Sequence, residues 1–169
     1  MTARGTASAA ALTPAQVWAT IARQPFCVVA MVSRRGHGRS VGVVPAVDGD
    51  DVWFAASERD WKIDHLRHQA EVSVTVPVRR GGLRALVAPI PPATVTFRAR
   101  AEVLGADAAP EKVRRTLLRG LTPADAERGG TVMVRLTPYG EFVTYGVGVP
   151  LRLLADTERA RARVPVARG

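Results

Sequence analysis

Short apolar runs separated by turn residues fill the segment from Phe26 to Val78, and their spacing predicts consecutive antiparallel strands. The expected strands cover residues 26–33, 40–47 and 52–57. A basic, glycine-containing turn joins the first two and an Asp-Gly turn joins the next two, and connections this short can link only antiparallel neighbours. A helix is expected between Asp60 and Gln69, with acidic residues early and basic residues late, an order that complements the helix dipole. Glu71–Val78 then alternates apolar and polar residues, which is typical of a half-buried strand.

The second half of the chain combines one long strand with a helical segment and a further pair of strands. From Thr94 to Leu104 apolar and polar residues alternate without interruption, so one face of this strand is expected to be buried and the other wet. Residues 107–128 predict two short helices that end at glycines. Residues 131–137 and 141–149 are expected to pair as a hairpin around Pro138-Tyr139-Gly140.

The ends of the chain and one internal segment carry weaker patterns. Thr13-Pro14 predicts a helix start, because a capping hydroxyl followed by proline suits the first helical turn. We expect residues 1–12 to be disordered. Residues 79–92 contain two glycines and three prolines and are expected to form a long loop that acts as a lid or a dimer arm. The tail, residues 156–169, is expected to hold one or two helical turns before Pro165.

Six or seven antiparallel strands with peripheral helices predict a mainly β fold, a split β-barrel in which closure removes exposed strand edges. A sandwich is the alternative architecture. At 169 residues the chain has room for a single domain, 1–169, with a proper core. No apolar run approaches the ~18–20 residues of a membrane span. The single cysteine, Cys27, lies in an apolar strand and is expected to be a buried thiol, which favours a cytoplasmic protein.

The formal charge of +9 raises the question of nucleic-acid binding. All basic residues except Lys62 and Lys112 are arginines, and they are scattered along the chain rather than gathered in one stretch. Aromatic residues make up 5% of the sequence, too few for base-stacking platforms. This pattern argues against a specific nucleic-acid partner, and the charge instead favours phosphorylated small molecules.

Other reaction classes find little support in the sequence. His65 and His68 lie three residues apart on one helix and His37 lies in a turn, so a three-histidine metal site would need distant segments to meet. The sequence has no G-x-S-x-G elbow of a serine hydrolase. Its Gly-x-Gly pairs lack the following helix that a dinucleotide-binding fold requires.

The order of strands and one lysine carry a resemblance to a known family. A strand, turn, strand, Asp-Gly turn and strand, followed by a corner with Lys62 at the start of a helix, resembles the FMN-binding split barrels that include pyridoxamine 5'-phosphate oxidase. Residues 140–150 look like a late barrel strand of the same family. The resemblance implies a homodimer with FMN in a groove between subunits. It also implies flavin-dependent redox chemistry on a small molecule, in which the cofactor transfers hydride and no catalytic side chain is expected.

The same resemblance places candidate cofactor-binding residues. It assigns the FMN phosphate to Lys62, which the positive end of the helix also favours; the alternative is a solvated surface lysine. It lays the isoalloxazine ring along the backbone of residues 41–44, where Gly42 either allows close approach or marks a bulge. Ser57 either caps the helix or binds the phosphate, and Trp61 packs either on the cofactor or on the barrel mouth. The full set of expected cofactor contacts is Val41, Gly42, Val43, Val44, Ser57, Arg59, Trp61, Lys62 and Thr94.

The sequence departs from pyridoxamine phosphate oxidases proper at several of these positions. Ser40 and Pro45 stand where that family has an arginine and a lysine. Trp61 stands where an arginine is common, and Thr94 stands where the family has a glutamine. The substrate-binding arginine and histidine near the family's C-terminus have no counterpart in the last eight residues of this chain. We therefore expect a relative of these enzymes that does not oxidise pyridoxamine phosphate.

These departures leave other functions open. The phosphate site is weakened unless Arg39 or Arg59 supplies the missing charge. A reductase that uses a deazaflavin cofactor is the first alternative. A non-catalytic flavin- or haem-binding protein, or a partner-binding module that kept only the barrel, is an alternative of another class. Tyr145 and Gly146 either approach the site, from the same or the second subunit, or pack in the core.

Overall fold

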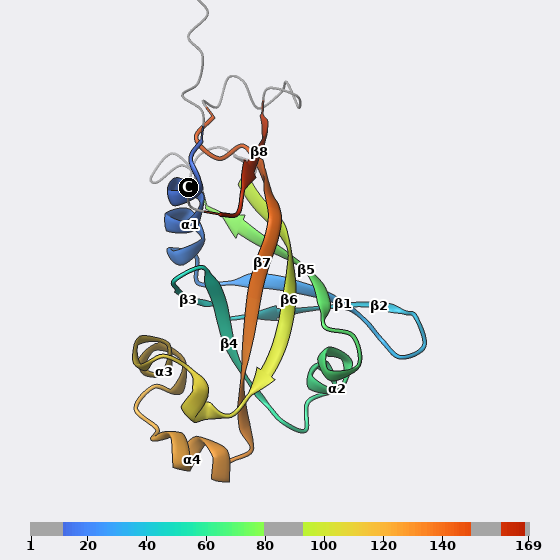
Figure 1. The fold of residues 1–169 in the computed structure, drawn as a ribbon, viewed down its shortest axis with the longest axis vertical. Coiled ribbons are helices and arrows are strands. Elements are labelled where there is room, and N and C mark those ends of the chain that lie inside the picture. The colour runs from blue at the N-terminus through green and yellow to red at the C-terminus, as the bar shows by residue number, and fades with distance from the viewer. Residues whose placement is uncertain (1–11, 80–92, 150–159, 168–169) are drawn as a thin grey trace, which may run out of the picture.

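The computed structural model describes residues 12–79, 93–149 and 160–167, and its centre is one curled antiparallel sheet (Figure 1). The strands follow the order β2-β1-β5-β6-β7-β4-β3, and β8 pairs with β7 beside this path. The predicted mainly β split barrel with peripheral helices is confirmed. In chain order the elements are α1 (Pro14–Ala22), β1 (Cys27–Val32), β2 (Gly38–Val43), β3 (Ala46–Asp48), β4 (Asp51–Ser57), α2 (Trp61–His68), β5 (Glu71–Val78), β6 (Ala93–Leu104), η2 (Ala106–Ala108), α3 (Glu111–Leu118), α4 (Pro123–Arg128), β7 (Thr131–Tyr145) and β8 (Arg161–Pro165).

The strand predicted at 40–47 is divided into two strands. β2 pairs with β1 and ends at Val43, whereas β3 pairs with β4 from Ala46 onward. Pro45 has no N–H to donate, so it interrupts the ladder. Because β2 and β3 stand at opposite ends of the strand order, the chain crosses from one end of the sheet to the other at Val44-Pro45. We call this crossing, where the barrel is split, the seam.

Alternating side chains fill the inside of the barrel. On β6 every second residue from Ala93 to Ala101 is buried, as the sequence pattern predicts. Helix α1 begins at the expected cap and packs onto the barrel through Trp18, which is 2% exposed. The Trp18 ring meets the Phe142 ring edge-on at 5.2 Å between centroids, and its Nε1–H donates to the carbonyl oxygen of Val166 at 3.2 Å. Helix α1 and the C-terminal segment are therefore held together on the same barrel core.

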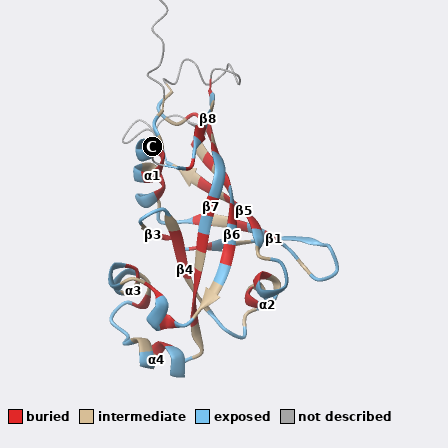
Figure 2. Cartoon of the chain, viewed as in Figure 1, coloured by how far each residue is buried: buried red, intermediate tan, exposed pale blue. Residues whose placement is uncertain are grey.

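A second, smaller apolar cluster lies outside the barrel, where the predicted helical segment 107–128 folds back on β4 and β7. Figure 2 shows buried positions on η2, α3 and α4. Val113 and Leu118 of α3 belong to this cluster together with Trp53 of β4 and Met133 of β7. This packing fixes the end of α3 beside the seam.

Residues 131–145 form one continuous strand, so the hairpin predicted around Pro138-Tyr139-Gly140 is wrong. β6 pairs with β7 on both sides of this tripeptide, and the register shifts between Thr96 and Arg98. Gly140 has a φ of 75°, which glycine adopts at little steric cost. The apparent turn signal therefore produces a β-bulge in a strand that continues past it.

The helical turns predicted in the C-terminal tail are also wrong for the part of the tail that is described. Arg161–Pro165 forms β8, which pairs antiparallel with residues 141–145 of β7. β4 pairs only with residues 131–136 of β7, so this further length of β7 would otherwise be an open edge. β8 covers that edge. An exposed strand edge can pair with another chain and so promotes aggregation.

Several predictions fall on residues outside the described ranges. They are the prediction of disorder for residues 1–11, the prediction of a loop for residues 80–92, and the prediction for the tail at residues 156–159 and 168–169. Across the described segments, no helix has both the length and the apolar character needed to cross a membrane.

Candidate functional site

A pocket of about 360 Å³ lies at the seam, on the outer side of the barrel. This volume is at the lower end of the range for small-molecule sites, about 300–1,000 Å³. The lining comes from the end of β2 and the crossing after it, from β4, from the start of α2 and from the end of α3. The lining residues are Gly42, Val43, Val44, Ala55, Lys62, Thr116, Leu117 and Arg119. The structure thus brings Lys62 together with the strand segment that the sequence predicts as the ring site.

β2 is suited to hold a flat ligand through its backbone. It stands first in the strand order, and no described strand pairs with its outer edge, so N–H and C=O groups along that edge are available to a ligand. Val43 is 9% exposed and belongs to the barrel core, whereas Val44 is 52% exposed. Val41 packs against the barrel core and does not line the pocket.

Gly42 lies in regular strand, and the alternative that it marks a bulge is wrong. The register between β1 and β2 runs without a shift along the whole of β2. The space that a side chain at Gly42 would take is filled by Phe26: a Cβ built on Gly42 would lie 2.2 Å from Cε2 and 2.5 Å from Cζ of the Phe26 ring. The group that approaches this bare backbone closely is therefore the aromatic ring of Phe26.

Lys62 is a partly buried cation and not a solvated surface lysine. Its side chain is 12% exposed, and its ammonium group pairs with the carboxylate of Asp60. Asp60 is the N-cap of α2 and also accepts the backbone N–H of Lys62 at 3.4 Å. The side-chain hydrogen bond from Lys62 holds the pKa of Asp60 below its usual value. Because Asp60 neutralises part of the Lys62 charge, a ligand meets a weaker cation here than an unpaired lysine would offer.

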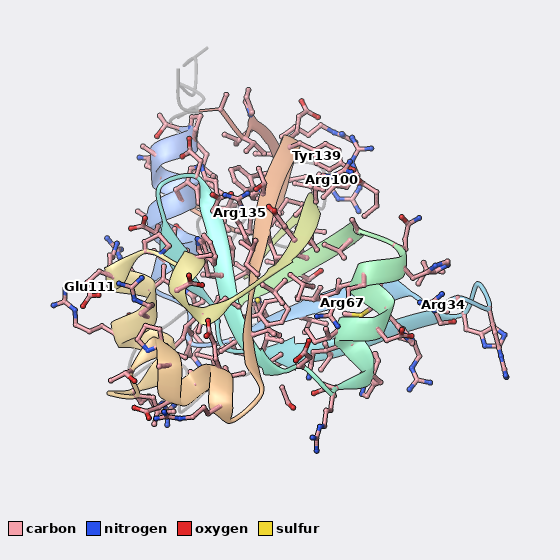
Figure 3. All side chains as sticks on the ribbon, turned by 60° about the horizontal axis from the view of Figure 1, so that its bottom comes forward. Arg34, Arg67, Arg100, Glu111, Arg135 and Tyr139 are labelled. Atoms are coloured by element: carbon pink, nitrogen blue, oxygen red, sulfur yellow. The ribbon has the colours of Figure 1, made fainter. Side chains whose placement is uncertain are left out.

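Polar contacts hold α2, and with it Lys62, beside the β1–β2 hairpin. Arg34 in the hairpin turn forms an ion pair with Asp64 of α2 at 3.3 Å (Figure 3). The guanidinium of Arg39 on β2 lies 4.9 Å from the centroid of the Trp61 ring. The exposed ion pair between Arg34 and Asp64 contributes little stability, so its role is to orient α2. Trp61 is 38% exposed and is not among the lining residues.

The opposite wall of the pocket is the last turn of α3. Arg119 ends this helix with φ 50° and ψ 42°, a left-handed conformation that is uncommon away from glycine. Thr116 donates its hydroxyl hydrogen to the carbonyl oxygen of Lys112 at 2.9 Å, and Leu117 contributes apolar surface. Sequence reasoning missed this wall. Arg119-Gly120 signals a helix end, but only the packing of α3 on β4 places that end at the seam.

Ser57 and Arg59 lie near the pocket in sequence but do not line it. Ser57 is exposed at the end of β4, and its carbonyl oxygen accepts the N–H of Asp60 at 3.0 Å. Because Asp60 caps α2, the expectation that Ser57 caps the helix is wrong. Arg59 is exposed in the turn between β4 and α2. Neither Arg59 nor Arg39 supplies the pocket's second cation, which is Arg119.

Thr94 is separated from the seam by the length of β7. It pairs with Tyr145 at one end of that strand, whereas Ser57 of β4 pairs with Thr131 at the other end. A 15-residue strand spans roughly 40 Å or more. Thr94 and Lys62 of the same chain therefore do not contact one small ligand. Tyr145 is half-buried on β7 at the Thr94 end, and Gly146 donates its N–H to the carbonyl oxygen of Ala160 at 2.7 Å.

The chemistry of the pocket is that of binding and orientation. Two cationic side chains, Lys62 and Arg119, face a lining of apolar side chains and strand backbone. Among the described residues, the lining includes no histidine, cysteine or carboxylate side chain. In the segments that the structure describes, no three His, Cys, Asp or Glu residues gather in a way that could hold a metal ion.

Solved structures with the same fold have low sequence identity to this chain. A protein named F420 reductase superposes with a TM-score of 0.54 at 17% identity, over 73% of this chain and 93% of its own. A FAD-binding protein from Mesorhizobium loti gives a TM-score of 0.52 at 16% identity, over 76% of this chain and 91% of its own. A heme-binding protein from Mycobacterium smegmatis gives 0.59 at 17% identity, over 80% of this chain and 55% of its own. Likeness at these identities establishes the fold alone.

A family assignment comes from the sequence profile. No curated protein sequence gives a significant match. The profile described as pyridoxamine 5'-phosphate oxidase matches residues 13–141, a segment that includes β2, the seam, Lys62 and α3. The chain therefore belongs to the pyridoxamine 5'-phosphate oxidase family.

Proposed function

We propose that this protein binds FMN in the seam pocket and uses it to oxidise or reduce a small molecule. The observation that carries the proposal is the meeting of a partly buried cation, Lys62, with the free edge of β2 in one pocket. The cation can bind a phosphate, and the strand edge can form hydrogen bonds with the polar edge of a flat ring system. Membership of the flavin-binding family is consistent with both.

The residues of the pocket fit the two ends of this cofactor. Lys62 would hold the phosphate, and Arg119 is a second cation of the same lining. The backbone of Gly42–Val44 would hold the ring, because a strand edge offers both N–H donors and C=O acceptors. FMN bound there would supply the hydride chemistry, and the chain's own residues would bind it, orient it and limit the access of water.

A homodimer belongs to this proposal. The family resemblance assigns Thr94 to the cofactor, yet Thr94 pairs with one end of β7, whereas Lys62 follows Ser57, which pairs with the other end. Both residues reach one ligand only if a second copy supplies one of them. Light scattering of the purified protein tests this directly, and a monomer at all concentrations would remove Thr94 from the site.

A deazaflavin-dependent reductase is the second candidate function. The Asp60–Lys62 pair favours it, because the pair leaves less positive charge for a phosphate monoester than an unpaired lysine would. Haem binding, the non-catalytic alternative, has no comparable observation. In the part of the chain that the structure describes, the lining includes none of the histidine, cysteine, methionine or tyrosine side chains that ligate haem iron.

The deciding experiment is a fluorescence titration of the full-length protein with FMN and, separately, with the deazaflavin cofactor. Saturable binding of FMN, reduced by Lys62→Ala, is the expected result. Preference for the deazaflavin would replace FMN by the second candidate. Binding of neither would overturn the proposal and leave a barrel that has lost its cofactor site.

A further inference from the structure

The ring of Phe26 lies on the bare backbone of Gly42. A side chain at Gly42 would overlap this ring, since its Cβ would be 2.2 Å from the nearest ring carbon. Phe26 nevertheless remains 46% exposed. One part of the ring therefore touches the strand that forms the pocket wall, and the rest of the ring is open to the outside.

Cover of a strand glycine by an aromatic ring also stabilises sheets, so the contact by itself has a structural explanation. Two observations go further. Val44, which directly follows β2 and lines the same pocket as Gly42, is 52% exposed, so it and Phe26 are both large apolar residues open to the outside. At the other end of β2, Gly38 has nothing within 4 Å of the position of a Cβ. The aromatic cover is therefore confined to the glycine that lines the pocket.

Phe26 is not itself among the lining residues of the seam pocket, but it covers Gly42, which is. We propose that Phe26 is the ring-binding residue at the rim of this pocket: its exposed face packs against a planar aromatic heterocycle held along the edge of β2. This inference rests on the proposed function and names the residue that recognises the ring, as distinct from Lys62, which recognises the phosphate. Stacked or edge-on aromatic pairs gain energy from contact area and from the ring quadrupole, with no hydrogen bond required. Phe26 would thus act on the ring whether or not a phosphate is attached.

Riboflavin, which is FMN without its phosphate, separates the two roles. We expect Phe26→Ala to weaken the binding of FMN and of riboflavin by the same factor, about tenfold for one lost aromatic contact. Lys62→Ala is expected to weaken FMN alone. Unchanged affinity for both flavins in Phe26→Ala, or a loss confined to FMN, would overturn the inference. Tighter binding of both would also overturn it, because the ring would then be an obstruction.

Val32→Ala is the matched control. Val32 is 42% exposed at the end of β1, the strand that Phe26 precedes, and it pairs with Gly38 at the far end of β2, which is not among the lining residues. Its removal is expected to leave both affinities unchanged. Equal losses in Val32→Ala and Phe26→Ala would mean a general effect on the β1–β2 hairpin and would overturn the inference.

Gly42→Ala provides a second variant that keeps Phe26 in the chain. The new methyl group would push the far end of an exposed ring away from the strand, which costs little stability. We expect it to weaken both flavins, as Phe26→Ala does, and unchanged affinity would contradict the inference if Phe26→Ala fails to fold. If the unmodified protein binds neither flavin, the proposed function and this inference fail together. If the unmodified protein binds both flavins and neither Phe26→Ala nor Gly42→Ala changes the affinities, the inference about Phe26 fails while the proposed function stands.

Discussion

The seam pocket and the outer face of β6 and β7 both carry arginines and hollows, but they use charge in different ways. We define the β6–β7 face by Arg98, Arg100, Glu102, Arg135 and Tyr139, three of which are labelled in Figure 3. Two hollows of about 630 and 580 Å³ border this face, and both exceed the 360 Å³ of the seam pocket. By volume alone, the β6–β7 face would be the stronger candidate site.

The exposure and pairing of the charged side chains instead favour the seam pocket. On the β6–β7 face Arg135 pairs with Glu102, Arg100 lies 3.7 Å from Glu71, and the Tyr139 hydroxyl donates to Glu71 at 2.5 Å. The Arg100 side chain is 75% exposed, so water and its partner satisfy it without a ligand. Lys62 at the seam is 12% exposed with one acid beside it. A largely buried cation that lines a pocket interacts more strongly with a ligand than an exposed one does, because water screens it less, and it therefore indicates a binding site better than a larger hollow does.

The largest effect is expected at Lys62. Lys62→Ala removes the partly buried cation and should weaken FMN binding by about 1–3 kcal/mol, or roughly fivefold to 150-fold in Kd. Fluorescence titration measures this change. Lys112→Ala is the matched control, because Lys112 is the other lysine of the chain and its side chain is 73% exposed on α3. Unchanged FMN affinity in a folded Lys62→Ala protein would remove the seam as the phosphate site.

Arg119 should give the next largest effect. Arg119→Ala takes away the second cation of the lining, and we expect about a fivefold to tenfold loss of FMN affinity, as for one charged contact at a more exposed position. Arg115→Ala tests whether any arginine of α3 would do the same. Arg115 is 76% exposed and pairs with Glu111, away from the pocket lining. Equal losses in the two variants would mean that the general charge of α3 attracts FMN and that Arg119 has no contact of its own.

The barrel could be predicted from sequence because the pairing of β1 with β2 and of β3 with β4 depends on short-range signals, although Pro45 divides the strand predicted at 40–47. The turns between β1 and β2 and between β3 and β4 force antiparallel pairing whatever the rest of the chain does. Lys62 follows from the same local pattern, since it stands where a strand ends and a helix begins. The role of Asp60 as helix cap and as partner of Lys62 is also local, and the capping rule applied to Asp60 would have found it.

The elements that sequence missed depend on distant partners. Pro138-Tyr139-Gly140 has the composition of a turn, and only the continuous pairing with β6 makes it a bulge. β8 forms because residues 141–145 of β7 leave an edge for it, which no pattern within residues 161–165 reveals. Arg119 reaches the pocket because α3 packs on Trp53 and Met133, two residues that are remote from it in sequence.

A smaller change in FMN affinity, in the opposite direction, is expected for a substitution at Asp60. Asp60→Asn keeps a side chain that caps helices well but removes the charge that pairs with Lys62. The freed ammonium should bind FMN more tightly, by about twofold to fivefold, which corresponds to a fraction of a charged contact. A loss of FMN affinity in Asp60→Asn would mean that the carboxylate orients Lys62 and does not compete with the phosphate.

The same carboxylate predicts a pH dependence of stability. Lys62 lowers the pKa of Asp60 in the folded protein. The ionised carboxylate therefore stabilises the fold at pH values above its unfolded pKa, and this contribution is lost as the pH falls through the lower, folded value. Between neutral pH and pH values below the ordinary aspartate pKa of 3.8, denaturant unfolding should show a larger loss of stability in the unmodified protein than in Asp60→Asn. Parallel curves would show that the pair contributes nothing to stability.

The smallest effect on binding, and the sharpest test of the contrast between the two regions, is expected on the β6–β7 face. The hydrogen bond to Glu71 raises the pKa of Tyr139, because the neutral hydroxyl is the form that can donate. Glu71→Gln should therefore bring this pKa down toward the ordinary tyrosine value. Ultraviolet titration of tyrosinate follows the change, and Tyr139→Phe assigns it, since Tyr145 is the only other tyrosine.

FMN affinity should not change in Glu71→Gln, although the variant alters a charge beside a hollow larger than the seam pocket. The reason is that Glu71 already satisfies exposed groups, Arg100 and Tyr139, which water can satisfy in its place. A change in FMN affinity as large as that of Asp60→Asn would show that the β6–β7 face also contacts the cofactor. The second copy of a homodimer would be its first explanation, because one chain holds Tyr139 and Lys62 on different elements, β7 and α2, which border different pockets.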